Sequence, residues 1–232
     1  MCGRYTLATP DPAAIRARFP VGEAVEIRRR FNIAPGDDVL AVTTDKQGDP
    51  RGELLHWGLV PSWAEGPGSR LKMINARVET VGRRPAFRTA FERFRCLIVA
   101  DGFYEWQAVP GAPKRAHHIT TSAGTPFAFA GLWSVWKGSD ERTLRSCAIL
   151  TTAANDRVAP LHDRMPVILA PEAEAAWLDP RTPQPELLGL LAPLEPALTV
   201  IRPVGPAVND ARFDGPECLE PPPAQALPAT LF

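Results

Sequence analysis

The sequence predicts a single β-rich domain of the α+β class with short helices at its periphery. Strand-like runs dominate the middle of the 232-residue chain, separated by turns rich in glycine and proline. The chain contains 26 prolines, roughly twice the usual frequency of ~5%, which shortens helices and stiffens loops. Because no long helices alternate with the strands, a βαβ parallel sheet is not expected.

The first half of the chain alternates strand candidates with two short helices. One helix is predicted over residues 11–19, with Pro12 in its first turn. A second is predicted over residues 86–94, where an aromatic stripe at helical spacing is expected to face the core. That stripe consists of Phe87, Phe91 and Phe94. The predicted strands are residues 2–8, 39–44, 53–57, 74–80 and 96–100.

The second half continues the β pattern and ends in a tail. We expect the domain to cover residues 1–214 and residues 215–232, which include Pro221-Pro222-Pro223, to be extended or disordered. The predicted helices are residues 171–178 and 183–191. The predicted strands are residues 117–121, 127–136, 143–152, 167–169 and 198–203.

Composition narrows the possible function classes. Net charge is zero, so the overall field gives no reason to expect attachment to acidic membranes. The four cysteines show no CxxC spacing, and no HExxH motif or phosphate-binding glycine loop occurs, so we expect neither metal nor cofactor. No leader and no apolar run of ~20 residues is present, which predicts a cytoplasmic protein. We expect a monomer.

A cysteine directly follows the initiator methionine, so Cys2 can become the amino terminus. It would then carry an α-amine and a thiol, with reference pKa values near ~8 and ~8.5. The amine can condense with an aldehyde to an imine, and the thiolate can close on the imine carbon to give a thiazolidine. The alternative interpretation is that Cys2 has no chemical role and is simply a small apolar residue at the start of a strand.

Three further positions are candidates for chemistry. In an extended Ile74–Thr80 segment, alternation places Asn75, Arg77 and Glu79 on one face, as it also would in a solvent-facing edge strand. Glu105 lies between two aromatic residues, which favours its protonated form, although an ordinary outward position fits as well. His162 directly precedes Asp163 and Arg164, and a histidine beside these charged groups can transfer protons. A lone histidine, however, is often structural.

Several motifs in chain order together resemble the SOS-response-associated peptidase (SRAP) family, whose members trap abasic sites in single-stranded DNA through an N-terminal cysteine. The motifs that carry this resemblance are Met1-Cys2-Gly3-Arg4-Tyr5, Asn32-Ile33-Ala34-Pro35, Trp57-Gly58-Leu59-Val60-Pro61-Ser62-Trp63, Asn75-Ala76-Arg77-Val78-Glu79-Thr80, Ala100-Asp101-Gly102-Phe103-Tyr104-Glu105-Trp106, Phe129-Ala130-Gly131-Leu132-Trp133 and His162-Asp163-Arg164-Met165-Pro166.

The resemblance implies a barrel-like antiparallel sheet and a single-stranded DNA partner that contains abasic sites. By this resemblance, Cys2 forms the crosslink once Met1 has been removed. Asn75 would position the reacting groups, and Glu105 and His162 would transfer protons. Arg4 and Arg77 would hold phosphates, and Asn32, Pro35 and Trp63 would line the strand channel. The chain departs from the family pattern after Lys114, which puts DNA contacts there in doubt. The family name adds a peptidase activity, linked to removal of Met1.

Two other functions remain open at this point. An N-terminal-nucleophile amidohydrolase would use the α-amine as a base and the Cys2 thiolate to attack an amide. A noncatalytic single-strand-binding module would use the basic residues and tryptophans and would be indifferent to Cys2.

Overall fold

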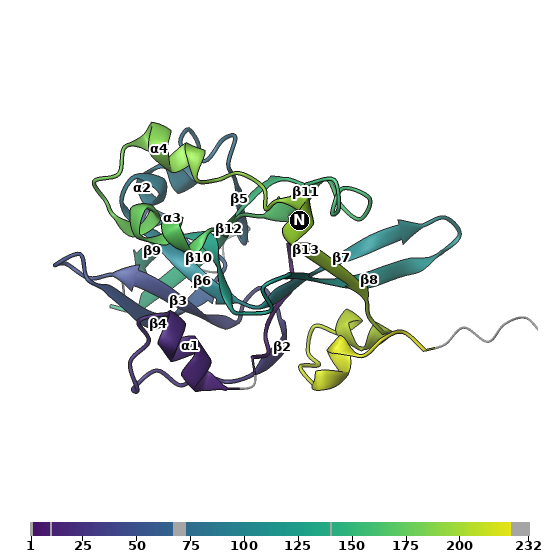
Figure 1. The fold of residues 1–232 in the computed structure, drawn as a ribbon. Helices are drawn as coiled ribbons and strands as arrows, with labels where there is room; N and C mark the ends of the chain where they lie inside the picture. Colours follow the sequence, from purple (N-terminus) through teal and green to yellow (C-terminus); the bar gives the residue numbers. More distant parts are fainter. Residues whose placement is uncertain (1, 10, 67–72, 140, 224–232) are drawn as a thin grey trace, which may run out of the picture.

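Five strands close into a barrel at the centre of the computed structural model, which describes residues 2–9, 11–66, 73–139 and 141–223 (Figure 1). The strands pair in the order β10–β4–β3–β6–β9, and β9 pairs with β10 to close the ring. All neighbours are antiparallel except β10 and β4, which run parallel. The barrel strands are β3 (Asp38–Thr44), β4 (Pro50–Trp57), β6 (Arg95–Ala100), β9 (Phe127–Lys137) and β10 (Thr143–Ala153). The predicted barrel-like, β-rich fold is confirmed.

Three short strands extend the barrel at one end of β10 and along β9. Strand β5 pairs parallel with β10, while β11 and β12 pair antiparallel with β10 and β9. Their bounds are β5 (Asn75–Arg77), β11 (Arg164–Pro166) and β12 (Ile168–Leu169). The predicted strand over 74–80 is thus too long, because the chain turns after Arg77 and takes Glu79 off the expected face.

A second sheet of five strands lies beside the barrel, in the order β13–β8–β7–β1–β2 (Figure 1). Its short strand β1, between β7 and the edge strand β2, is anchored in the barrel core by Tyr5, whose ring makes edge contacts with Trp57 and Phe129 at 5.3 and 5.6 Å. Burying such rings contributes roughly 1.5–3 kcal/mol each. The strands are β1 (Tyr5–Leu7), β2 (Arg30–Ile33), β7 (Gly102–Val109), β8 (Ala112–Thr121) and β13 (Thr199–Pro203).

Four α-helices lie on the periphery, and each has a proline in its first turn, where a missing N–H costs nothing. They are α1 (Pro12–Arg18), α2 (Pro85–Arg93), α3 (Pro171–Leu178) and α4 (Gln184–Gly189). The buried Arg95 guanidinium donates to carbonyls at the ends of both α2 and α3, which fastens the two helices to β6. Phe94 was expected in the core, but it follows the last turn of α2 and is 39% exposed. Among the described residues no helix is long and apolar enough to cross a bilayer.

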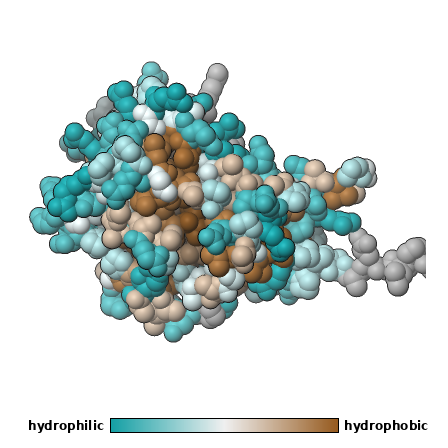
Figure 2. Space-filling view, turned by 45° about the horizontal axis from the view of Figure 1, so that its top comes forward, coloured by the Kyte–Doolittle hydropathy of each residue, from teal (hydrophilic) through white to brown (hydrophobic). Residues whose placement is uncertain are grey.

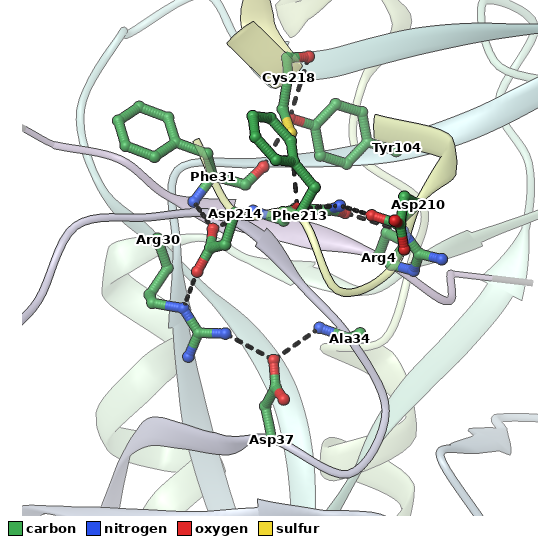
Figure 3. A network of polar contacts seen from close by, with 11 residues as sticks. Arg4, Arg30, Phe31, Ala34, Asp37, Tyr104, Asp210, Phe213, Asp214 and Cys218 are labelled. Carbon is green, nitrogen blue, oxygen red and sulfur yellow. Dashed lines mark hydrogen bonds and ion pairs between the residues drawn. The ribbon is translucent and has the colours of Figure 1, made fainter. Parts of the chain in front are cut away.

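The C-terminal segment packs against the N-terminal strands through a polar network (Figure 3). Asp214 accepts hydrogen bonds from the backbone N–H groups of Phe31 and Asn32 at 2.6 and 2.8 Å, and it contacts the Arg30 guanidinium. The segment contains the 3-10 helices η2 (Pro206–Asn209) and η3 (Pro216–Leu219), and η1 (Pro196–Leu198) precedes β13. Cys218 in η3 is fully buried. The extended tail predicted from Gly215 therefore does not begin there, and its part from 224 onward lies outside the described residues.

Figure 2 shows hydrophobic side chains gathered at the centre of one face, flanked by hydrophilic lobes. A mostly apolar cavity of about 560 Å³ lies between the loop before β9, the start of α3 and the segment after α4. None of the site residues predicted from the sequence lines it.

Candidate functional site

Cys2, Asn75 and Glu105 come from distant parts of the chain and meet beside the mouth of the barrel. The Asn75 amide nitrogen donates to the carbonyl oxygen of Cys2 at 2.8 Å. Strand β1 pairs with β7 so that Tyr5 faces Phe103 and Thr6 faces Gly102. Continuing that antiparallel register places Gly3 opposite Glu105, next to Cys2.

Cys2 is completely buried in the chain that still carries Met1. Burial, with a smaller contribution from the Glu105 charge, raises the pKa of its thiol far above the ordinary range. The thiol is therefore neutral in this state of the chain and not yet a nucleophile. Its sulfur lies 3.9 Å from the carbonyl oxygen of Arg4.

Glu105 is 4% exposed, and burial raises its pKa to about 7. The predicted desolvation of this carboxyl is thereby confirmed. A group with this pKa is present in both protonation states near neutral pH and can take up or release a proton in a reaction. The charges of Asp163, in the segment before β11, and of Lys114, on β8, also influence the pKa of Glu105.

His162 lies within range of the same two charges, Asp163 and Lys114, which influence its pKa as they do that of Glu105. Burial is the largest cause and lowers the pKa of His162 below the ordinary value. The backbone N–H of Arg164 donates to Nδ1 of His162 at 2.9 Å. The same nitrogen lies 2.9 Å from a carboxylate oxygen of Asp163, so an acceptor and a donor both approach Nδ1.

Arg164 and Glu79 form an ion pair that the sequence analysis did not predict. Arg164 is 9% exposed and donates to both carboxylate oxygens of Glu79 and to the carbonyl oxygen of Thr151. The Arg164 guanidinium lowers the pKa of Glu79. Glu79 and Arg164 lie in two of the motifs noted above, but their partnership depends on β5 and β11 both pairing with β10.

The residues predicted to contact DNA occupy different settings. Arg77 is exposed at the end of β5, two residues after Asn75. Trp63 is 62% exposed on the turn after β4, and Pro35 is exposed on the turn after β2. These three are available to a ligand.

Arg4 and Asn32 are engaged within the protein instead (Figure 3). Arg4 donates to the side-chain oxygen of Asn32 and to the carbonyl oxygen of Val208, both at 2.9 Å. Asn32 is 1% exposed, and its amide nitrogen donates to the carbonyls of Asp210 and Phe213. The structure thus assigns Asn32 to holding the C-terminal segment and does not bring it to a surface channel.

The donor set of the cluster favours acid–base and nucleophilic chemistry. Among the described residues, no three His, Cys, Asp or Glu side chains are placed to hold a metal ion together. The cluster offers a cysteine, an amide, a carboxyl near neutrality and a neutral imidazole, which suit condensation of an amine with a carbonyl compound.

Comparison with known proteins places these features in a family. The family model of the SOS response associated peptidase (SRAP) matches residues 1–211. The chain is 38% identical over 226 residues to abasic site processing protein YoaM of Bacillus subtilis, covering 95% of this chain and 98% of the relative. It is 32% identical to abasic site processing protein YedK of Escherichia coli, covering 83% and 84% of the two chains.

A solved structure of a Bacteroides thetaiotaomicron protein superposes with a TM-score of 0.84, at 20% identity, covering 97% of this chain and all of the other. This likeness concerns the fold alone.

Proposed function

Because the chain belongs to the SOS response associated peptidase family, we propose that it processes abasic sites in single-stranded DNA by forming a covalent crosslink through Cys2. The observation that carries the proposal is the meeting of Cys2, Asn75 and Glu105, since it surrounds a potential 1,2-aminothiol with a carboxyl whose pKa is about 7. The names of its relatives, abasic site processing proteins, support the choice of substrate.

The reaction begins after removal of Met1, which gives Cys2 a free α-amine. The amine adds to the aldehyde of the ring-opened sugar, and the carbinolamine loses water to give an imine. The thiolate then adds to the imine carbon, while the imine nitrogen takes up a proton. One C–N and one C–S bond form and the carbonyl oxygen leaves as water, so no oxidant or reductant is needed.

Each residue of the cluster has a role in this sequence. Glu105 takes a proton from the Cys2 ammonium and returns it during loss of water. The Nε2–H of His162 donates to the departing oxygen. Asn75 holds the Cys2 carbonyl through its nitrogen, and its buried oxygen, which has no hydrogen-bond partner among the described residues, accepts from the Cys2 amine.

Mass spectrometry after incubation with an abasic single-stranded oligonucleotide tests the proposal. We expect an adduct equal to protein without Met1 plus oligonucleotide minus one water. Cys2→Ala should abolish it although Cys96, Cys147 and Cys218 remain, because a cysteine within the chain has no free α-amine and cannot form a thiazolidine. A Met1-retaining chain should also fail to react.

The same samples separate the alternative functions. Turnover of amide substrates without any adduct would favour an N-terminal-nucleophile amidohydrolase. Salt-sensitive binding that Cys2→Ser leaves intact, with no adduct in the parent chain, would favour a noncatalytic binding module. Cleavage of other proteins is not part of the proposal, whereas self-release of the crosslink would appear as loss of adduct over time.

A further inference from the structure

The loop between β10 and β11 carries His162, and a buried amide fixes it in place. Asn155 is 6% exposed, and its side-chain nitrogen donates to the carbonyl oxygen of Leu194 at 2.7 Å and to the Thr199 hydroxyl at 2.9 Å. Its side-chain oxygen accepts from two backbone N–H groups of the loop itself. Because both ends of this amide are satisfied, the loop that presents His162 is preorganised.

Asp163 closes the end of this loop through its backbone and not through its side chain. The Ala154 N–H donates to the Asp163 carbonyl oxygen at 3.0 Å. The side chain of Asp163 is 83% exposed, and within the described part of the chain its ion pair is with His162. The next residue, Arg164, directs its guanidinium to Glu79 instead. A change of the Asp163 side chain therefore leaves the bonds that shape the loop in place.

Two groups of opposite character meet at Nδ1 of His162. Oδ1 of Asp163 lies 2.9 Å from this nitrogen, and the backbone N–H of Arg164 donates to it at 2.9 Å. The N–H stabilises a ring whose Nδ1 carries a lone pair, whereas the carboxylate stabilises a ring whose Nδ1 carries a proton. The neutral ring and the imidazolium therefore each have a partner at Nδ1, and the ring can change its protonation state without turning. Neither of these two contacts uses Nε2.

Charges from other elements act on the same ring. Burial is the largest cause that lowers the pKa of His162, and the amino terminus and Lys114 of β8 lower it further, whereas the Asp163 carboxylate raises it. Glu105 of β7 is also influenced by Asp163 and Lys114. The Arg164 guanidinium, which follows on β11, is neutralised by its own ion pair. Asp163 is thus the acidic side chain that offsets the cations around this imidazole.

We propose that Asp163 is a positioning residue for the crosslinking reaction, which holds the Nδ1–H of the His162 imidazolium so that Nε2 releases a proton and recovers it. This inference rests on the proposed function. It gives a role to a side chain that the proposed function leaves without one.

The protons balance over the two steps that His162 serves. Nε2 of the imidazolium gives its proton to the carbinolamine hydroxyl, the C–O bond breaks, and water leaves behind the protonated imine. The neutral ring keeps its other proton on Nδ1, against the Asp163 carboxylate. The Cys2 thiol then releases its proton to Nε2, and the sulfur electron pair forms the C–S bond to the imine carbon. The imidazolium is restored, and no further reactant is consumed.

Titration of His162 by NMR in the Cys2→Ala chain, with isotope-labelled histidine, tests the contact without crosslinking. The signal that is missing in His162→Gln identifies the ring. Asp163→Asn should lower the pKa of His162 by about half a unit, the size expected for a partly exposed ion pair. The matched control Asp156→Asn removes the same charge from another exposed position of this loop and should shift the pKa by about a tenth of a unit at most. An unchanged titration in Asp163→Asn would overturn the proposal.

The pH dependence of the crosslinking rate gives a second measurement. Above the pKa of His162 the imidazolium fraction falls tenfold with each pH unit, so Asp163→Asn should slow crosslinking about threefold there and match the parent chain well below that pKa. Asp163→Glu, which keeps a carboxylate, should restore most of the rate. Because Asp163 also acts on Glu105, the comparison is repeated in the Glu105→Gln chain, where the threefold ratio should persist.

The outcomes separate the positioning role from the proposed function. Slowing by the same factor at every pH would show that Asp163 is merely structural and would overturn the proposal. Absence of any crosslink in the parent chain would instead refute the proposed function, and the titration in the Cys2→Ala chain would still decide whether Asp163 holds the ring of His162.

Discussion

The side-chain amide of Asn75 donates to the carbonyl oxygen of Cys2 at 2.8 Å, across 73 residues of sequence. This bond joins β5, at the end of the barrel, to the residue just before β1. It makes Asn75 the structural link between the barrel and the proposed nucleophile.

Replacing Asn75 tests this link. Asn75→Leu has similar size but no donor, and Asn75→Asp presents oxygens to the Cys2 carbonyl. A hydrogen bond contributes about 1 kcal/mol, and about 1.4 kcal/mol corresponds to a tenfold rate change, so we expect the leucine variant to crosslink about fivefold more slowly. The aspartate variant should be slower still because it adds repulsion. Gel analysis of the crosslink over time measures both rates, and an aspartate variant as fast as the parent would contradict the assignment.

The raised pKa of Glu105 predicts a pH-dependent stability. Its pKa is about 7 in the folded chain against an ordinary 4.5, so between these values the folded state holds a proton that the unfolded state has released. The free energy of unfolding therefore falls as pH rises through this window, by up to about 3 kcal/mol. Urea unfolding at several pH values should show a flatter profile for Glu105→Gln than for the parent.

Glu174 also has a raised pKa because of burial, so the difference between the two Glu105 profiles isolates this position. Parallel profiles would show that Glu105 is solvated. Glu105→Gln should also slow crosslinking and leave single-strand affinity intact.

The tautomer of His162 can be tested by amide replacements. The Arg164 N–H and the Asp163 carboxylate both approach Nδ1, so Nε2 is the proposed reacting nitrogen. Glutamine can place its amide nitrogen near the Nε2 position, whereas asparagine reaches only the Nδ1 position. We expect His162→Gln to retain roughly a fifth of the crosslinking rate and His162→Asn to lose about fivefold more, since a hydrogen bond of about 1 kcal/mol corresponds to about a fivefold rate change. The reverse order would place the reacting proton on Nδ1.

Gly102 begins β7 where a side chain has no room. A Cβ there would lie 2.1 Å from Nε2 of His118 and 2.9 Å from the Thr6 hydroxyl. These two groups bond to each other at 3.0 Å in the buried middle of the second sheet. We expect Gly102→Ala to destabilise the chain by roughly 2 kcal/mol or more, as overpacking does. Gly22→Ala, whose Cβ would meet nothing within 4 Å, is the control, and equal melting temperatures would refute the clash.

Local sequence patterns predicted the helices and strands well, because proline positions and the alternation of apolar and polar residues depend only on neighbouring residues. The helix predicted over residues 11–19 and the strand predicted over 96–100 are confirmed, with bounds that shift by a residue or so. Cys96 and Cys147, which lie in apolar strand sequences, are both buried. The desolvation of Glu105 followed from its aromatic neighbours.

Partnerships across the chain could not be predicted in this way. The engagement of Asn32 with the C-terminal segment depends on residues about 180 positions away. Glu79, on the turn after β5, meets Arg164 of β11 only because β10 pairs with both β5 and β11. The exposure of Phe94 follows from the end of α2 at Arg93, which helical spacing alone does not fix.

The docking of Asp214 on Phe31 and Asn32 has a consequence for biosynthesis. Strand β2, which lies next to β1 in the second sheet, is held by a carboxylate more than 180 positions further along the chain. The segment around Asp214 must therefore be synthesised before this edge of the sheet is complete. Folding around the amino terminus is in this way coupled to the far end of the domain.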